Sequence, residues 1–248
     1  MEALRSQRQG GADALDGPGK TFIEGLKQMR HTHNVVKNLP SGLYGITSDK
    51  FGHTHLESAE IFLKAGVKII RYCGCTSGAT SRSTSDLIWD ARAVKELCGR
   101  YGAVLVVNGR IDVALAIGAD GVHLGQGDMS LNYARGIFNG TIGQSADTAE
   151  LARKAELEGA DYICINDVFM PASKPDSKAI GIEGLVRIAA AVAAPVYAAG
   201  GISLHNLHQL KAIRHSSPHL AGFASMSGVL SAKDPIAVAK SMMALWGA

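Results

Sequence analysis

The chain has 248 residues, of which 46% are hydrophobic and only 6% aromatic, and its formal net charge is +3 at pH 7. A chain this long and apolar can bury a large core, which we expect to consist mainly of Val, Ile, Leu and Ala. The small net charge speaks against a nucleic-acid-binding protein. The sequence contains no run of about 18 apolar residues, so we predict no membrane span. The four cysteines are too scattered for a disulfide framework, so we expect them to be reduced and the protein to be cytoplasmic.

Residues 1–40 differ from the rest of the chain. The first twenty are polar and Gly-rich and lack the apolar core of a signal peptide, while residues 21–37 are compatible with a short helix. We expect an N-terminal extension over 1–40, partly disordered or helical, followed by one domain over 41–248.

From Gly42 onward, short apolar runs alternate with helical patterns. The predicted strands and helices follow one another in this order: strand 42–47, helix 58–66, strand 67–72, helix 85–102, strand 103–108, helix 111–119, strand 120–125, helix 131–138, strand 141–145, helix 147–160, strand 161–166, helix 182–193, strand 195–201, helix 205–213, strand 221–228 and helix 234–247. Asp147, with Glu150 three residues later, predicts an N-cap for the helix at 147–160. Eight strand–helix units predict an α/β fold, a (β/α)₈ TIM barrel. An open doubly wound sheet is the alternative, although no GxGxxG motif follows the first strand.

In such barrels, active sites lie where each strand ends and its loop begins. Gly200 and Gly201 end the seventh strand, and the segment SMSG (225–228) ends the eighth. Glycines let backbone N–H groups approach an anion, and the loops after strands seven and eight commonly bind phosphate. These loops therefore predict a site for a small phosphorylated molecule, although the two glycines alone are also explained by a tight turn.

Two polar side chains lie in other predicted loops, and a histidine lies near the end of the fourth predicted strand. Asp128 follows strand four, where a carboxylate can hold Mg²⁺ against phosphate oxygens, although Gly-Asp sequences are also common in turns. Lys174 follows strand six in a loop broken by a proline, where a lysine can bind a diphosphate or simply be solvated. We expect His123 to pack at the end of strand four.

Four segments together carry a family resemblance. VNGRIDVALAIGADGVHLGQGDM (107–129), GADYICINDVFMPASK (159–174), PVYAAGGI (195–202) and SMSGVLSAKDP (225–235) resemble the motifs of thiamine-phosphate synthases, and SMSGVL is equally similar to the related thiazole tautomerases. The resemblance spans roughly residues 42 to 246. It implies a TIM barrel, often dimeric, that joins hydroxymethylpyrimidine diphosphate to thiazole phosphate and releases diphosphate with the help of Mg²⁺.

The resemblance also implies roles for individual residues. The expected catalytic residues match family positions that contact the pyrimidine diphosphate: Asn108, Ser145 and Lys174. The expected substrate-binding residues further include Arg71 and the residues that match the thiazole-phosphate site: Ser173, Gly200, Gly201, Met226 and Ser227. Asp128 matches a magnesium ligand.

The chain departs from the family pattern on one side of this site. The second strand of the family ends Q-(L/Y)-R-x-K, whereas RYCGC (71–75) places Cys73 and Cys75 at the arginine and lysine positions. Gly109 occupies the position of a second magnesium-binding aspartate. Further replacements are Pro171 for a threonine, Asp147 for a histidine, and Asn166-Asp167 for Gly-Pro.

These departures leave three hypotheses open. The first is a thiamine-phosphate synthase in which Arg71 and Arg82 replace the lost cations. The second is a paralogue that binds or isomerises thiazole phosphate, with Asp147 or His123 as the base, or a ligand-binding regulator. The third is a zinc site formed by Cys73, Cys75, Cys164 and His123.

Overall fold

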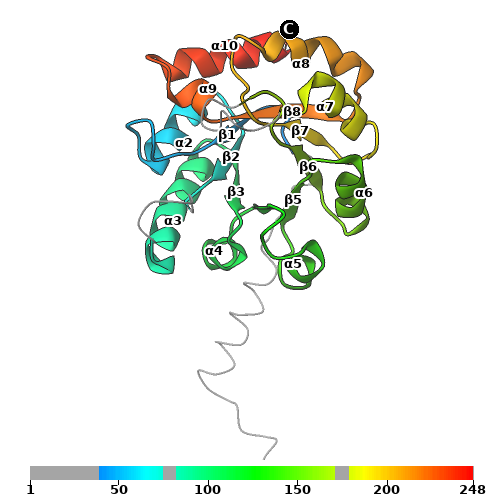
Figure 1. Cartoon of the computed structure of the whole chain (residues 1–248). Coiled ribbons are helices and arrows are strands. Elements are labelled where there is room, and N and C mark those ends of the chain that lie inside the picture. Colours follow the sequence, from blue (N-terminus) through cyan, green and yellow to red (C-terminus); the bar gives the residue numbers. More distant parts are fainter. Residues whose placement is uncertain (1–38, 75–81, 171–178, 248) are drawn as a thin grey trace, which may run out of the picture. The chain divides into compact units, whose positions relative to one another are not determined.

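The computed structural model describes residues 39–74, 82–170 and 179–247. Its centre is a closed barrel of parallel strands, joined in the order β1 to β8, with helices arranged around it (Figure 1). The strands are β1 (Gly42–Ile46), β2 (Ile69–Tyr72), β3 (Val104–Asn108), β4 (Gly121–Leu124), β5 (Thr141–Ser145), β6 (Tyr162–Ile165), β7 (Val196–Ala198) and β8 (Leu220–Ser225). Because β1 pairs with β8, the prediction of a TIM barrel is confirmed and the open-sheet alternative is wrong.

The helices alternate with the strands, as predicted. They are α2 (His55–Lys64), α3 (Thr84–Arg100), α4 (Ile111–Ile117), α5 (Leu131–Ile137), α6 (Ala149–Leu157), α7 (Gly181–Ala189), α8 (Leu207–Ile213), α9 (Ser227–Leu230) and α10 (Pro235–Gly247), with a short 3₁₀ turn at Arg214–Ser216. In the part of the chain that the structure describes, no helix is both long and apolar enough to cross a membrane.

Two helix starts differ from the sequence prediction because of their N-caps. The helix predicted from residue 58 begins at His55, because Thr54 and Glu57 form a capping box in which each side chain accepts a hydrogen bond from the other's backbone N–H. Helix α6 is capped by Thr148 and not by Asp147, since the threonine hydroxyl accepts a hydrogen bond from the N–H of Leu151 at 3.2 Å.

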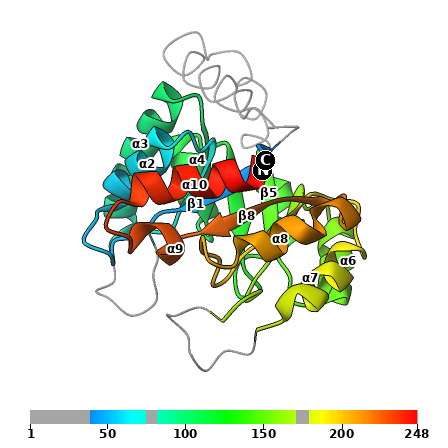
Figure 2. The same ribbon diagram turned by 90° about the horizontal axis from the view of Figure 1, so that it is seen from above.

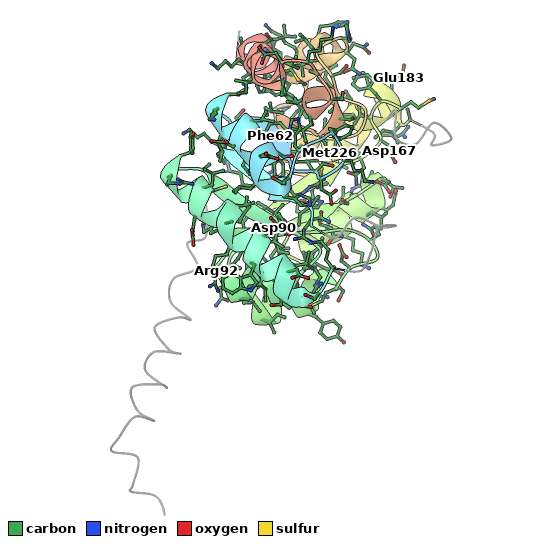
Figure 3. The ribbon with its side chains drawn as sticks, turned by 90° about the vertical axis from the view of Figure 1, so that its left-hand side faces the viewer. Phe62, Asp90, Arg92, Asp167, Glu183 and Met226 are labelled. Carbon is green, nitrogen blue, oxygen red and sulfur yellow. The ribbon has the colours of Figure 1, made fainter. Side chains whose placement is uncertain are left out.

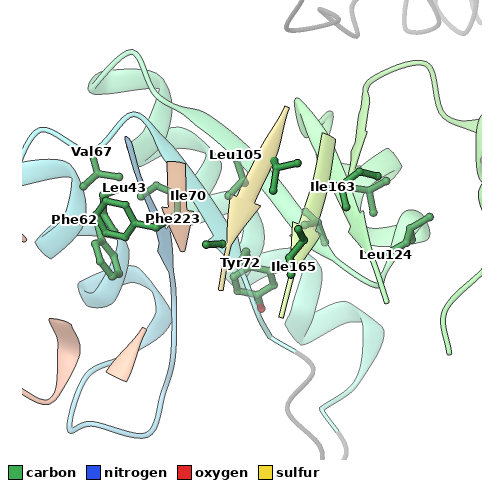
Figure 4. Close-up of a cluster of buried hydrophobic side chains, with 14 of the residues drawn as sticks. Leu43, Phe62, Val67, Ile70, Tyr72, Leu105, Leu124, Ile163, Ile165 and Phe223 are labelled. Atoms are coloured by element: carbon green, nitrogen blue, oxygen red, sulfur yellow. The ribbon is translucent and has the colours of Figure 1, made fainter. Parts of the chain in front are cut away.

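The outward-facing side chains of the strands form the larger part of the core. Residues such as Ile70, Leu105 and Ile163 are fully buried between the barrel and its helices (Figure 4). Phe62 of α2 packs against the barrel, and Gly45 of β1 leaves the space for its ring, because a Cβ at Gly45 would lie 2.6 Å from the ring. This layer has the aliphatic character predicted from the composition.

The barrel interior is different, because aromatic and polar groups fill much of it. Tyr44, Tyr162 and Tyr197 are completely buried there, with ring centroids between 5.5 and 6.1 Å apart. His123 of β4 stacks beside Tyr162 at 5.6 Å. Val, Ile, Leu and Ala thus build most of the core, as expected, while in the interior tyrosines and a histidine share the space with Ile46, Ile69 and Val106 at the strand positions that point inward.

The C-terminal part of the chain closes the barrel beside its first strand. Strand β8 ends at Ser225 and Ser227 already begins α9, so the strand predicted over 221–228 is shorter than expected. Helix α10 packs against β1 and α8, and it lies across the outside of the barrel in Figure 2. The early end of β8 turns the SMSG segment into a loop and the start of a helix.

Candidate active site

A cavity of about 230 Å³ opens at the carboxyl ends of the strands. Side chains and backbone from β1, β2, β6, β7 and β8 and the following loops line it: Ile46, Arg71, Asn166, Asp167, Ala199, Gly200, Gly201, Ile202, Ala224, Ser225, Met226 and Ser227. Asp167 and Met226, which belong to this lining, are labelled in Figure 3. The cavity thus brings together five residues predicted to bind substrate: Arg71, Gly200, Gly201, Met226 and Ser227.

The two glycines after β7 have backbone shapes that other residues rarely adopt. Gly200 and Gly201 have φ values of 90° and 62°. A Cβ at Gly200 would lie 2.5 Å from the backbone N of Asp167, and one at Gly201 would lie 2.7 Å from the carbonyl O of Phe169. Glycine is therefore needed both for the turn and for the approach of the loop after β6.

The loop after β8 approaches the loop after β7 just as closely. A Cβ at Gly228 would lie 2.1 Å from the carbonyl O of Ile202, which also accepts a hydrogen bond from the Ser225 hydroxyl at 3.0 Å. Ser227 opens α9, and the first N–H groups of a helix have no partner within that helix. The two loops therefore place N–H groups at the cavity wall, an arrangement suited to an anion. We call this part, Gly200, Gly201, Met226 and Ser227, the cradle.

Arg71 brings a positive charge to the cavity from β2. Its guanidinium carbon lies 5.8 Å from the ring centroid of Tyr44, and its Nε is buried without a hydrogen-bond partner. Within the described residues, no carboxylate lies within ion-pairing distance of Arg71. A half-buried guanidinium with a buried Nε and no carboxylate partner is unfavourable in the ligand-free protein, and an anionic ligand would offset part of that cost.

Arg82, the other proposed replacement cation, is held on the outside of the barrel. Its guanidinium pairs with Asp90 of α3 at 2.8 Å and donates to the Tyr72 hydroxyl at 3.4 Å. The hydrogen bond to Asp90 raises the pKa of Arg82. Asp90 is labelled in Figure 3. Of the two arginines expected to replace the lost cations, only Arg71 lines the cavity.

Ser145 and His123 meet inside the barrel. Ser145 Oγ lies 2.9 Å from His123 Nε2, and His123 Nδ1 lies 3.1 Å from the Tyr162 hydroxyl. Burial holds the pKa of His123 well below its ordinary value, and the nearby charge of Arg71 lowers it further. A neutral histidine with both ring nitrogens engaged is unsuited to act as a solvent-accessible base. Asn108 lies beside His123 in the sheet register, at the end of β3.

Asp128 and Gly109 are neighbours across the barrel mouth. Asp128 accepts a hydrogen bond from the Gly125 N–H at 2.7 Å, and a Cβ at Gly109 would lie 3.0 Å from Asp128 Oδ1. The position that holds a second aspartate in the resembling family is therefore adjacent to the remaining carboxylate. Mg²⁺ is often held by one or two carboxylates together with substrate phosphates, so Asp128 alone fits such an ion in part.

The structure does not support the zinc hypothesis. Among the described residues, no three His, Cys, Asp or Glu side chains are arranged to hold a metal ion. His123 uses its two ring nitrogens for Tyr162 and Ser145. Cys75, one of the four expected ligands, lies outside the described residues, as do the predicted site residues Ser173 and Lys174 and the replaced Pro171.

Comparison with known proteins agrees with this arrangement. The sequence model of a family described as thiamine monophosphate synthase matches residues 43–229, which is more than half of the chain. The chain belongs to the thiamine monophosphate synthase family. The match includes every strand of the barrel and the start of α9.

Individual relatives cover nearly the same region. A thiamine-phosphate synthase of Caldivirga maquilingensis is 38% identical over 84% of this chain and 98% of its own length, and one of Archaeoglobus fulgidus is 42% identical over 82% and 92%. The solved structure of a thiamine phosphate pyrophosphorylase from Pyrococcus furiosus is 31% identical, with a TM-score of 0.73 over 83% of this chain and 95% of its own. A 3-hexulose-6-phosphate synthase from Salmonella typhimurium, at 18% identity and a TM-score of 0.59, shares the fold.

Among the cavity-lining residues that were not predicted as site residues, one is a carboxylate. Asp167 lines the cavity with φ of 51°, the left-handed region that an aspartate tolerates better than most residues. By sequence, Asn166-Asp167 stands out only as a replacement of the family's Gly-Pro. Its place directly after β6 is the signal that points to the site. Asp147, proposed as an alternative base, is exposed after β5 and is not part of the cavity lining.

Proposed function

We propose that this protein is a thiamine-phosphate synthase that joins hydroxymethylpyrimidine diphosphate to thiazole phosphate and releases diphosphate. The observation that carries the proposal is the 230 Å³ cavity that combines the cradle with the half-buried cation of Arg71. A site with N–H groups on one wall and a guanidinium on another suits a substrate pair with several anionic groups. The names and near-complete overlap of the relatives support the same reaction. Cysteines without a disulfide pattern favour a cytoplasmic location.

In this proposal the cradle holds the monophosphate of the thiazole. The backbone N–H groups around Gly201 and Ser227 donate hydrogen bonds to the phosphate oxygens, which fixes the thiazole ring above the centre of the barrel. The thiazole nitrogen then forms a bond to the methylene carbon of the pyrimidine as the bond from that carbon to the diphosphate oxygen breaks. Holding both substrates in one cavity supplies much of the rate by orientation alone.

The other residues act on the departing diphosphate. Asn108, Ser145 and Lys174 match family positions at this substrate, and we assign them to binding its oxygens. Arg71 adds a cation on the side where Cys73 and Cys75 have replaced family cations. Negative charge develops on the leaving group as the bond breaks, so fixed donors and charges lower the barrier. Mg²⁺, held by Asp128 and the substrate, would supply further charge neutralisation when bound.

A coupling assay tests the proposal. Folded protein is incubated with both substrates and Mg²⁺, and formation of thiamine phosphate and of diphosphate is measured. We expect turnover together with binding of each half-substrate in calorimetry. Turnover no higher than in an Arg71→Leu, Asp128→Asn double variant would contradict the proposed function.

Isomerisation of thiazole phosphate is the second candidate, and Asp167 favours it. A proton-transfer enzyme needs a positioned base but no diphosphate site. Asp167 is a carboxylate in the lining of the cavity that contains the cradle. This candidate predicts that the protein binds thiazole phosphate but not the pyrimidine diphosphate. It also predicts that the wild-type protein isomerises thiazole phosphate and that an Asp167→Asn variant does not. Tight binding of the pyrimidine diphosphate would count against it.

A further inference from the structure

A row of four buried side chains connects the centre of the barrel to Ser145. The Tyr44 and Tyr162 hydroxyl oxygens are 3.0 Å apart, Tyr162 is 3.1 Å from His123 Nδ1, and His123 Nε2 is 2.9 Å from Ser145 Oγ. Three strands besides β1 contribute to the row: β4, β5 and β6. None of the four side chains is more than 9% exposed. Such a row has very few ways to place its protons.

The proton count favours one direction along the row. A neutral histidine has one N–H, and each hydroxyl has one proton to donate. If His123 carries its proton on Nδ1, it donates to Tyr162, and then one phenolic proton of Tyr162 or Tyr44 has no acceptor. Among the described residues, the Tyr44 hydroxyl has no hydrogen-bond partner besides Tyr162. Arg71 packs over the Tyr44 ring, and its guanidinium has donors only.

The opposite direction gives an acceptor to both phenolic protons, which are completely buried, and to the imidazole proton. Tyr44 donates to Tyr162, Tyr162 donates to Nδ1, and Nε2–H donates to Ser145 Oγ. The Ser145 proton is then the only one in the row without a partner inside it, and Ser145 ends β5 at the active-site end of the barrel. Leaving Tyr44 or Tyr162, which are completely buried, without an acceptor is disfavoured strongly enough to select this direction by about tenfold or more.

The position of Tyr162 in the row is set by a missing side chain. Gly143 on β5 lies directly against the Tyr162 ring, because a Cβ there would be 1.9 Å from Cζ and 2.4 Å from the hydroxyl oxygen. Gly143 is also the register partner of both His123 and Tyr162. The strand therefore keeps a gap in which the phenol reaches Nδ1.

We propose that His123 is a positioning residue that, as the Nε2–H tautomer fixed by Tyr162 and Tyr44, turns the Ser145 hydroxyl outward as a hydrogen-bond donor to an anionic oxygen of the substrate. The inference rests on the proposed function for the identity of that substrate, the pyrimidine diphosphate. Its structural part, the tautomer, holds without any substrate. A serine hydroxyl that already accepts a hydrogen bond from Nε2–H has its own proton free to donate to an oxyanion.

Nitrogen NMR of substrate-free protein with ¹⁵N-labelled histidine tests the tautomer directly. We expect the His123 spectrum to show Nε2 protonated and Nδ1 unprotonated in more than about 90% of molecules. In Tyr162→Phe the donor to Nδ1 is gone, and we expect a larger share of the Nδ1–H form. Protonation mainly at Nδ1 in the wild-type protein would overturn the inference while leaving the proposed function untouched.

Kinetics of two matched variants test the positioning role. Tyr162→Phe and Tyr197→Phe each remove one hydroxyl from a fully buried interior tyrosine, but the Tyr197 hydroxyl donates to the Pro40 carbonyl and not to the row. We expect Tyr162→Phe to lower kcat about tenfold with KM little changed, and Tyr197→Phe to change kcat less than about twofold. Circular dichroism checks that both fold. Equal loss of kcat in the two variants would mean a merely structural role.

If neither variant nor the wild-type protein turns over both substrates, the proposed function fails. The NMR result then still decides whether Ser145 is held as a donor. The two failures are therefore distinguishable.

Discussion

The two sides of the barrel mouth differ in what they present to a ligand. At the ends of β7 and β8 the cradle consists mainly of backbone, whose shape depends on glycines with positive φ and no room for a Cβ. At the ends of β2 and β3 the site depends on side chains, and here Cys73 and Gly109 stand where the family has charged groups. A substitution that moves the backbone of the cradle affects all of its N–H groups together. A substitution on the β2–β3 side changes one side chain and its charge. In this chain the cradle keeps the glycines that its shape requires, and the β2–β3 side is where the chain departs from the family pattern.

The largest expected effect is on the side-chain side. Arg71→Leu removes the only cation that lines the cavity among the described residues, and we expect kcat/KM to fall by about 10²–10³-fold. The same change removes a half-buried charge without a carboxylate partner, so the free energy of unfolding should not decrease. Steady-state kinetics and urea unfolding measure the two effects. Arg82→Leu, at an arginine paired with Asp90, is the control and should leave kcat/KM within about twofold. A rate loss together with a large loss of stability would mean that Arg71 is structural.

The next effect tests the backbone side. Gly201→Ala forces a Cβ to within 2.7 Å of the Phe169 carbonyl O at a φ of 62°, so the loop must move. We expect affinity for thiazole phosphate to fall about 10–100-fold, because N–H bonds to the phosphate are displaced. Isothermal calorimetry measures it. Gly136→Ala in α5 is the matched control, since a Cβ there meets nothing within 4 Å. Unchanged affinity in Gly201→Ala would place the phosphate elsewhere.

A smaller effect is expected from restoring a charge. Gly109→Asp puts a second carboxylate beside Asp128, and aspartate tolerates the φ of 69° at this position. We expect the Mg²⁺ concentration for half-maximal rate to fall about threefold to tenfold, and Mg²⁺ to raise the Tm more than in the wild-type protein. Gly109→Asn adds similar bulk without charge and should do neither. If both variants respond alike to Mg²⁺, the ion does not bind between positions 109 and 128.

The smallest effect concerns pH. The folded protein keeps His123 neutral because burial and Arg71 lower its pKa, while in the unfolded chain the imidazole takes up a proton near its ordinary value of 6.5. The unfolded state then binds more protons, so the free energy of unfolding should decrease as the pH falls below about 6.5, by about 1 kcal/mol per pH unit. Urea unfolding from pH 7.5 to 5 should show a shallower slope for His123→Gln. Some slope should remain, because burial also lowers the pKa of His55.

The sequence predicted the barrel better than its interior. Strand and helix alternation depends on local periodicity, which the sequence shows directly, and Gly200, Gly201 and Ser227 followed from their places after strands. Inward-facing contacts depend on register between distant strands, so the row from Tyr44 to Ser145 had no local signal. The same reason explains why Arg71 and Arg82 looked equivalent: only the partner at Asp90, in a helix, separates them. Asp167 was not predicted because the family pattern has no carboxylate there, although its place directly after β6 points to the site.

The contact between Gly143 and Tyr162 limits how this barrel interior can evolve. A side chain at 143 is compatible with the present structure only if the ring at 162 is lost or moved, and the partner of His123 goes with it. Substitutions at the two positions should therefore be strongly non-additive, with each tolerated chiefly in the background of the other. In relatives that carry a larger residue at the position of Gly143, we expect different contacts to orient the serine that matches Ser145.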